Sequence, residues 1–523
     1  MNMSRIFVIA LLVLGAAQAA PLRVGGLESP PLFAAGSPPA ASPPLVDAVK
    51  AGNREAALAL VAKKADVNAA EPDGTTALHW AVQRNDLDLV TRLIRAGAKV
   101  NVKNDYGSTP MSEAAVVASA PLLEALLEAG GDVESPNSDG QTALMVVART
   151  SQVDAARLLI QRGANVNAVE KWRGQTALMW ATAQKQPAMV RELIARGAQV
   201  DARSMVNDWQ RQVTAEPRAI YRPAGGLTPL LYAAREGCAD CARALVEKGA
   251  QLNLADPEGL SPLLTAIINM QFDTAKYLIS AGANPNQWDL WGRAPLYAAV
   301  DVNTVPRGGR PDLPSLDETT GLDVIRMLLE AGANPNARLR LPPPFRNVGN
   351  DRGLDGMLTT GTTPLLRAAK ALDAPAIRLL LVKKADLTLT NSRAMTPTMA
   401  AAGLGSTDAD TRGFYLSEDT QQRSIDSLKL LLDAGGDINT KDSRGLTALH
   451  EAARWGWNDV VTFLVSRGAD LNAKDAKGNT PVDSALGKAG GNSRGGARID
   501  VHEDTAALLK KLAAEAAPRA ANQ

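Results

Sequence analysis

The chain has 523 residues and a balanced charge, with 56 Lys and Arg against 55 Asp and Glu, for a formal net charge of +1. A balanced chain has no global attraction for nucleic acid or for an anionic membrane surface, so we expect neither as a partner. Aromatic residues make up only 4% of the chain, so the places where they occur are informative.

The N-terminal residues have the pattern of a secretory signal peptide. Arg5 precedes an apolar run over residues 6–17, and Ala17-Gln18-Ala19 offers a small-x-small cleavage site. The run is too short to span a bilayer, so we expect no membrane insertion. Residues 1–19 are therefore expected to direct export, to the periplasm or the medium, and the proline-rich residues 20–43 to form a linker.

The rest of the chain repeats with a period of 33 residues. A glycine precedes each Thr-Pro-Leu or Thr-Ala-Leu stretch, and six of the ten intervals between these positions are 33 residues. A fixed period of this length is typical of a solenoid, in which each unit buries its apolar face only against its neighbours. The positions are Gly74, Gly107, Gly140, Gly174, Gly226, Gly259, Gly292, Gly361, Gly445 and Gly478, with Ala394 in the same slot.

A single unit, residues 445–477, predicts a turn and two helices. Thr447 can cap a helix, and seven other units carry proline at the next position, where the first turn of a helix tolerates it. Apolar residues at a spacing of three and four over 460–465 predict the second helix. Gly468 then ends this helix in a left-handed conformation.

These residues resemble the ankyrin repeat, which has a turn, two antiparallel helices and a Gly-Ala-Asp-x-Asn exit. Thr76-Ala77-Leu78-His79 and Thr447-Ala448-Leu449-His450 are near the family's Thr-Pro-Leu-His, and the exit motif recurs at 163–167, 282–286, 332–336 and 468–472. The resemblance covers residues 44–516 and implies an all-α solenoid of about twelve helix-turn-helix units, with short β-turns or hairpins between repeats. Residues 517–523 are left as a C-terminal tail.

Three positions depart from the family pattern. Lys64 and Lys384 replace the glycine that ends the second helix, and Ala294 replaces the capping threonine. We expect these units to be locally weaker, without a different fold.

Five insertions interrupt the period. Those at 203–225 and 337–360 extend the turn between repeats, and those at 302–320, 404–423 and 487–500 separate the two helices of one unit. The resemblance implies that the extended turns flank the concave side, where partners of this family usually bind. Each turn insertion combines four arginines with aromatic residues, as binding hot spots do, although long loops also fold back as packing. The candidate partner-binding residues here are Trp209, Tyr221, Arg222, Phe345 and Arg346.

The tryptophans fall on different slots of the repeat. Trp80 and Trp180 share a slot in the first helix that packs between units in the family, so we expect both in the core. Exposed apolar clusters mark interaction sites, and a second group of residues falls on turn tips or at the end of a first helix, where we expect exposure. The alternative is that neighbouring insertions cover them. This group of candidate partner-binding residues is Trp172, Trp288, Leu290, Trp291, Arg454 and Trp455.

Cys238 and Cys241 are the only cysteines and lie at the start of a second helix. Their spacing brings the two Cα atoms near disulfide range. Ala242 stands where a c-type haem motif needs histidine, and the chain's three histidines lie too far along the array to complete a zinc site. The remaining alternatives are a structural disulfide or buried thiols, and a redox dithiol, for which a thioredoxin-like context is missing.

No Gly-x-Ser-x-Gly, P-loop or His-Glu-x-x-His motif occurs, and no insertion is long enough to hold a catalytic domain. We expect a monomeric, exported scaffold without catalytic residues, metal or cofactor, which binds a protein partner along the concave, turn-bearing edge. One alternative is a thiol redox or carrier protein that uses the cysteine pair. Another is a secreted effector with the same scaffold.

Overall fold

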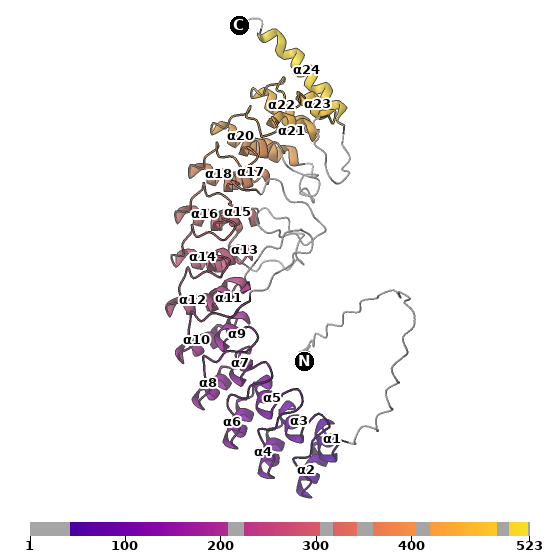
Figure 1. Cartoon of the computed structure of the whole chain (residues 1–523), viewed down its shortest axis with the longest axis vertical. Coiled ribbons are helices and arrows are strands. Elements are labelled where there is room, and N and C mark those ends of the chain that lie inside the picture. Colours follow the sequence, from indigo (N-terminus) through magenta and orange to yellow (C-terminus); the bar gives the residue numbers. More distant parts are fainter. Residues whose placement is uncertain are drawn as a thin grey trace, which may run out of the picture. The chain divides into compact units, whose positions relative to one another are not determined.

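The protein is described by a computed structural model that covers residues 42–207, 224–303, 317–341, 359–403, 419–488 and 501–520. Two units divide the chain, Met1–Ser42 and Pro43–Gln523, and the second contains all the described helices. Figure 1 shows these helices following one another in consecutive pairs from α1 to α24.

The helices form two layers. Each first helix of a pair packs against the first helix of the next pair, and each second helix packs against the next second helix in the same way. The first helices are α1 (Pro44–Lys50), α3 (Ala77–Gln83), α5 (Pro110–Val117), α7 (Ala143–Val147), α9 (Ala177–Ala183), α11 (Pro229–Glu236), α13 (Pro262–Ile268), α15 (Pro295–Asn303), α17 (Pro364–Lys370), α19 (Pro397–Ala401), α21 (Ala448–Arg454) and α23 (Pro481–Ala485). The second helices are α2 (Arg54–Ala62), α4 (Leu87–Arg95), α6 (Ala120–Glu128), α8 (Val153–Gln161), α10 (Pro187–Ala195), α12 (Ala239–Glu247), α14 (Phe272–Ser280), α16 (Gly321–Glu330), α18 (Ala374–Val382), α20 (Thr420–Asp433), α22 (Asn458–Ser466) and α24 (Glu503–Ala520).

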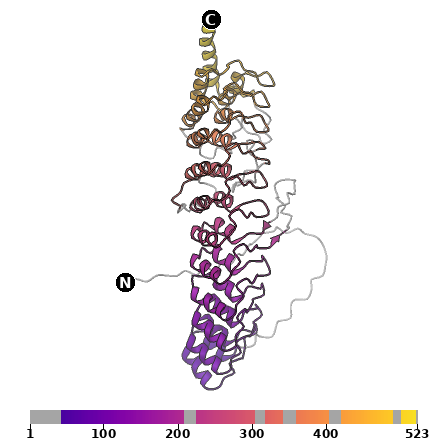
Figure 2. The same cartoon turned by 90° about the vertical axis from the view of Figure 1, so that its left-hand side faces the viewer.

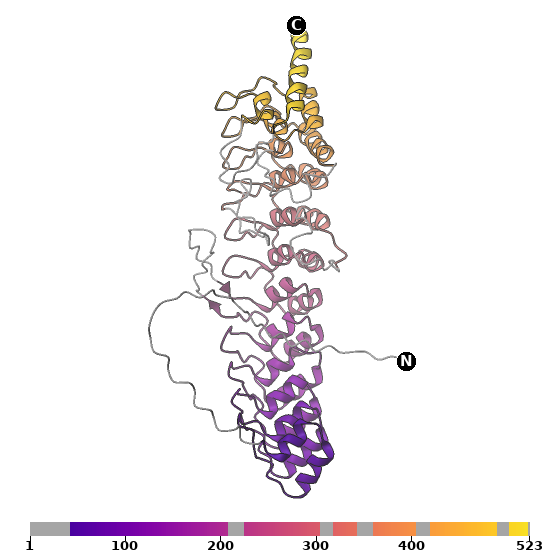
Figure 3. The same ribbon diagram turned by 90° about the vertical axis from the view of Figure 1, so that its right-hand side faces the viewer.

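The turns between pairs project from one side of the stacked helices, as Figures 2 and 3 show. They contain little regular strand. Among the described residues, β1 (Val206–Asn207) and β2 (Ala224–Gly225) pair antiparallel where the chain enters and leaves the first turn insertion. The predicted all-α solenoid with short hairpins is confirmed.

The first helices begin at capping residues that also connect neighbouring units. In α21, the Thr447 backbone N–H donates to His450 Nδ1 at 3.2 Å, and His450 Nε2 lies 3.1 Å from the Asn479 carbonyl oxygen of the next unit. His79 repeats both contacts, with Thr76 and Ser108. Burial lowers the pKa of both histidines, which favours the neutral imidazole that this pattern requires. These histidines therefore have a structural role.

The second helices end in a left-handed residue whatever its identity. Gly468 has a φ of 93°, and Lys64 and Lys384 take φ values of 60° and 61° in the equivalent slot. A β-carbon added at Gly468 would meet nothing within 4 Å, so only the backbone conformation disfavours a side chain there. Ala394 likewise keeps a positive φ of 58° in the slot of the turn glycine. These positions of the repeat therefore keep a left-handed backbone conformation even where glycine is replaced.

An asparagine at the end of the exit motif ties each of several units to the next. Asn439 Nδ2 donates to the Gly468 carbonyl at 3.1 Å, and its Oδ1 accepts the Asp470 backbone N–H at 2.9 Å. One primary amide thus satisfies a helix-terminal carbonyl and a backbone N–H of the following unit. The same pair of bonds starts from Asn68, Asn101, Asn167 and Asn286.

Asp201 occupies this slot once and shows how the link adapts. A carboxylate accepts but cannot donate. Asp201 Oδ1 still accepts the Gln251 backbone N–H at 3.0 Å, and Asp201 Oδ2 accepts a second bond from Gln251 Nε2 at 3.2 Å, so two hydrogen bonds still link the units.

This exchange leads to a stability prediction. Asn439→Asp removes the donor to the Gly468 carbonyl, so we expect the free energy of unfolding at pH 7 to fall by about 1–2 kcal/mol. Adding Asp470→Gln, which copies the Asp201–Gln251 arrangement, should recover part of that loss. Urea unfolding of wild type, both single variants and the double variant measures the coupling. Strictly additive single-variant effects would contradict the role given to the amide.

Candidate functional site

The exposed large apolar side chains gather on the turn-bearing edge. Twelve such residues are exposed among the described residues, and eight of them lie on the turns between pairs. Single exposed apolar residues are ordinary, but their concentration on one edge indicates an interaction surface. The eight are Tyr106, Val169, Trp172, Met205, Val206, Trp288, Leu290 and Leu341.

A hollow of about 810 Å³ lies beside Trp288, between two successive turns. The Arg340 guanidinium stacks over the Trp288 ring at 3.8 Å from its centroid. Polar groups of Asn286, Asn334 and Thr360 line the same hollow. A cation held against an indole face leaves its N–H groups free to reach an incoming ligand, so the arrangement offers both an apolar wall and a positive charge.

Trp288 and Leu290 are exposed, at 46% and 48%, as the turn-tip interpretation expected, and so is Trp172 at 63%. Trp291 is not exposed, because only 5% of it remains accessible. Its carbonyl accepts the backbone N–H groups of Arg340 and Leu341, at 2.9 and 3.2 Å, and the start of the second turn insertion thus lies against it. The expectation of exposure was wrong for Trp291, where the alternative of coverage holds.

Trp455 is also less exposed than expected. Its ring stacks on buried Trp457 with centroids 5.9 Å apart, and its Nε1 donates to the Gly403 carbonyl at 3.1 Å. Arg454 forms an ion pair with buried Glu451, Nη2 to Oε1 at 2.6 Å. Both side chains are therefore engaged in contacts within the array, and Trp457, which the sequence analysis did not single out, is what draws Trp455 inward.

Trp80 and Trp180 are partly buried and pack against the core, as their shared slot predicted. Trp80 Nε1 donates to Glu71 Oε2 at 2.8 Å. Trp180 Nε1 is buried and has no hydrogen-bond partner in the described part of the chain. The candidates Trp209, Tyr221, Arg222, Phe345 and Arg346 lie outside the described residues.

Two features of this edge were missed at the level of sequence. Trp288 is a candidate from sequence, whereas Arg340 is only one of the four arginines of the second turn insertion. That insertion separates Gly292 from the next turn glycine, Gly361, and hides that the turns of Trp288 and Arg340 are neighbours. Met205 and Val206 were passed over as the start of an insertion. Val206 pairs with Gly225 at the other end of that insertion, and the Met205 carbonyl accepts the Gly226 N–H just after it, so a hairpin register could have placed both on the edge.

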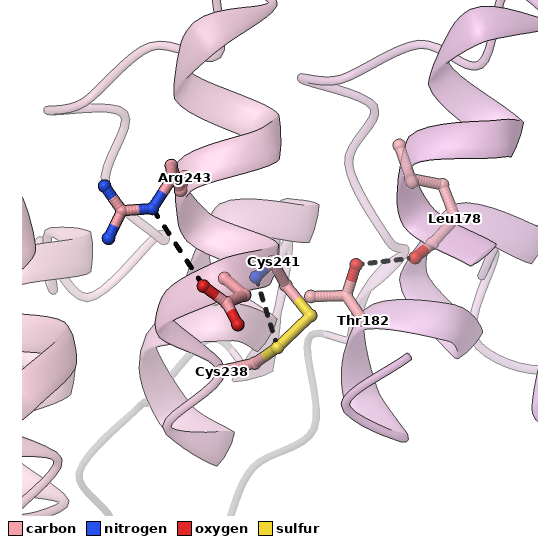
Figure 4. The surroundings of a disulfide bond; sticks show 6 residues. Leu178, Thr182, Cys238, Cys241 and Arg243 are labelled. Carbon is pink, nitrogen blue, oxygen red and sulfur yellow. Dashed lines mark hydrogen bonds and ion pairs between the residues drawn. A yellow bond between two sulfur atoms is a disulfide. The ribbon is translucent and has the colours of Figure 1, made fainter. Parts of the chain in front are cut away.

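Cys238 and Cys241 form a disulfide across the first turn of α12. Figure 4 shows Thr182 of α9 beside the two sulfurs. Cys238 caps the helix, because its Sγ accepts the Cys241 backbone N–H at 3.2 Å. Both residues are buried, at 5% and 0% exposure, so a redox partner would not reach either sulfur without local opening. In the described residues, no group of three or more histidine, cysteine and acidic side chains is arranged to hold a metal ion.

Comparison with known proteins bears on the identity of this array. A model for ankyrin repeats, three copies long, matches residues 45–137, 111–204, 211–304 and 417–496. The chain belongs to the ankyrin repeat family. A crystal structure of the human ASB11 ankyrin repeat domain is 22% identical, with 46% of this chain and 99% of that chain covered and a TM-score of 0.39. No curated protein matched the chain.

No helix in the described part of the ankyrin chain has the length and apolar character needed to cross a bilayer.

Asp256 lies in the turn that precedes the Trp288 turn. Its Oδ1 accepts the backbone N–H groups of Glu258 and Leu260, each at 2.9 Å. Burial, with the nearby charges of Glu258 and Asp289, raises the pKa of Asp256 to about 6. Asn104, Asn137 and Asn391 make equivalent backbone bonds in their own turns, so an amide fits this slot.

The raised pKa of Asp256 predicts a pH-dependent effect. Between its ordinary pKa and about 6 the folded state holds more protons at this site than the unfolded state, so stability falls as pH rises through this window. Asp256→Asn removes the ionised form, and we expect it to raise the free energy of unfolding by about 1–2 kcal/mol at pH 8. The gain should shrink toward zero below pH 4. Urea unfolding at both pH values measures it, and an equal gain at both would contradict the cause.

The disulfide predicts a local stabilisation. Closing a loop of this size restricts the unfolded chain by about 2 kcal/mol. We expect Cys238→Ser with Cys241→Ser to lower the free energy of unfolding by about that amount, and a reductant to lower it in wild type but not in the variant. Chemical denaturation with and without dithiothreitol measures this. If dithiothreitol lowered the free energy of unfolding of the variant as much as that of wild type, the effect of the reductant would not come from the disulfide.

Proposed function

We propose that the protein is an exported, non-catalytic scaffold that binds a protein partner on its turn-bearing edge. Ankyrin repeats are protein interaction modules, and the match to their family model supports the general role. The concentration of exposed apolar side chains on the turns, next to the Trp288–Arg340 stack, is the observation that supports this edge. Arginine and tryptophan are the residues that most often anchor protein interfaces.

The proposed binding mode uses side chains, because the backbone of the turns is already engaged. The Leu290 backbone N–H donates to the Glu258 carbonyl at 2.9 Å, and Met205 N–H donates to the Arg173 carbonyl at 2.7 Å. A partner strand therefore cannot add to these N–H groups without breaking an existing bond. Trp288, Leu290 and Trp172 remain free to contribute apolar area, with Arg340 as the polar group beside them.

Export belongs to the proposal on the strength of residues 1–19. The expected mature protein starts after Ala19, and N-terminal sequencing of protein from separated periplasmic and culture fractions reads this start directly. Recovery with residue 1 intact from the cytoplasm alone would contradict export. The buried sulfurs favour a structural role for the cysteine pair over the thiol redox or carrier alternative. A secreted effector would share the same binding edge and differ in destination.

Site-specific crosslinking tests the binding edge. A photo-crosslinking residue at Leu290 should capture a discrete partner in cells, whereas the same residue at Val382 should not, because Val382 is 73% exposed but lies at the end of α18. Trp288→Ala in the Leu290 background should reduce capture at least about tenfold, as loss of an interface anchor does. Equal capture from both positions, or capture unaffected by Trp288→Ala, would contradict the proposal.

A further inference from the structure

The charges on the turns change in character along the array. We define a tip as the six residues before each turn glycine or Ala394, together with residues 338–341. Taken together, the tips before Trp288 expose both signs: Lys103 and Asp105 on one tip, Asp139 on the next, and Lys171 and Arg173 on the one after it. From residue 338 onward, the described tips expose only basic side chains among their charged residues. This set, the basic strip, is Arg338, Arg340, Arg393, Lys441, Arg444, Lys474 and Lys477.

The carboxylates of these later tips accept hydrogen bonds from backbone N–H groups of their own turns. Asp442 Oδ1 accepts the backbone N–H groups of Arg444 and Leu446, at 2.8 and 2.9 Å. Asp475 Oδ1 accepts those of Lys477 and Asn479, both at 2.8 Å. Asp442 also pairs with Arg444, Oδ2 to Nε at 2.9 Å. No carboxylate in the described ranges lies within ion-pair distance of the other six side chains of the strip. Within the described ranges, the charge of the strip is therefore balanced only at Arg444, by the Asp442 ion pair, and in part at Arg338, whose charge acts on Asp386.

Backbone hydrogen bonds hold these tips in a row. Ser392 N–H donates to the Thr360 carbonyl at 2.8 Å, and Ser443 N–H donates to the Arg393 carbonyl at 2.9 Å. Ala476 N–H continues the row to the Arg444 carbonyl at 2.8 Å. Packed helices repeat at roughly 10 Å, and an extended chain rises about 3.3 Å per residue, so about three residues of an extended peptide span one tip.

We propose that the basic strip binds an extended acidic segment of a protein partner, with glutamate or aspartate side chains facing successive tips. This inference rests on the proposed function of the turn-bearing edge and specifies the chemistry of the ligand. The Trp288–Arg340 hollow lies beside the first tips of the strip, so a large apolar residue at one end of the segment would fill it. The strip supplies charge complementarity, which sets register and association rate more than affinity.

A peptide fits this surface better than a nucleic acid or a membrane does. Tips 388–393, 439–444 and 472–477 contain no aromatic residue, whereas single-stranded nucleic acid binding relies on aromatic platforms for the bases. The same tips expose no large apolar side chain that could enter a lipid surface. The charges form a single row with one tip per unit, which matches one extended chain.

Fluorescence anisotropy with labelled peptides tests this proposal. The probe is a peptide of about 12 residues with glutamate at every third position and serine between, behind an N-terminal leucine, and the reference replaces glutamate by glutamine. Arg393→Glu with Lys441→Glu reverses two central charges of the strip. The control, Arg378→Glu with Lys429→Glu, makes the same charge change on exposed residues of α18 and α20 in the same two units. Thermal unfolding monitored by circular dichroism confirms that both variants are folded.

We expect the full-length protein to bind the acidic probe at least about tenfold more tightly than the glutamine reference, with affinity that falls as salt rises. The strip variant should lose about tenfold in affinity and the control variant less than twofold. Equal losses in both variants, or tighter binding to oligo-uridine or to phosphatidylserine vesicles than to the peptide, would overturn the proposal. Crosslinking from Leu290 that persists while the peptide fails to bind would reject this inference and leave the proposed function standing.

Discussion

Much of the array depends on the side-chain amide of the asparagine that ends the exit motif, which links each of five units to the next. A stack of short helix pairs has no central core, so each unit is stable only through the units beside it. The apolar faces supply most of that stability but are not directional. Asn439, with one donor and one acceptor, fixes the position of the next unit by bonding both Gly468 and Asp470. Where aspartate stands in this slot, Gln251 donates both its backbone N–H and its side-chain amide to Asp201, so that unit is also linked by two hydrogen bonds.

This internal bonding determines what the turn edge can offer a partner. The backbone groups of the tips bond to the neighbouring tips, and the carboxylates of Asp442 and Asp475 fold their own turns. The side chains that remain available are apolar near Trp172 and Trp288 and basic from Arg338 onward. Specificity on such an edge comes from the side-chain sequence of successive tips, since the backbone is the same in each. A partner is therefore recognised by the order of apolar and charged groups along an extended path.

The repeat could be predicted from sequence because each slot has one conformation, and even Lys64 and Lys384 take the left-handed backbone of the glycine they replace. The position of a residue within the repeat was less informative about its contacts with other units. Trp291 was expected to be exposed because its slot is a turn tip, but residues 340–341 cover it after an insertion that breaks the period. Trp455 turned inward because Trp457, two residues later, provides a stacking surface. The burial of both tryptophans depends on neighbouring residues, which the spacing of the turn glycines does not specify.

The central claim is that recognition takes place on the turn-bearing edge and not on the second helices. Hydroxyl-radical footprinting of the protein, alone and in complex with a partner purified from its native source, tests this claim most directly. The account predicts slower oxidation of Trp172, Trp288 and Leu290 in the complex, with Val116 of α5 and Val382 of α18 unchanged. Protection confined to the second helices, with Trp288 oxidised at the same rate in both states, would contradict it.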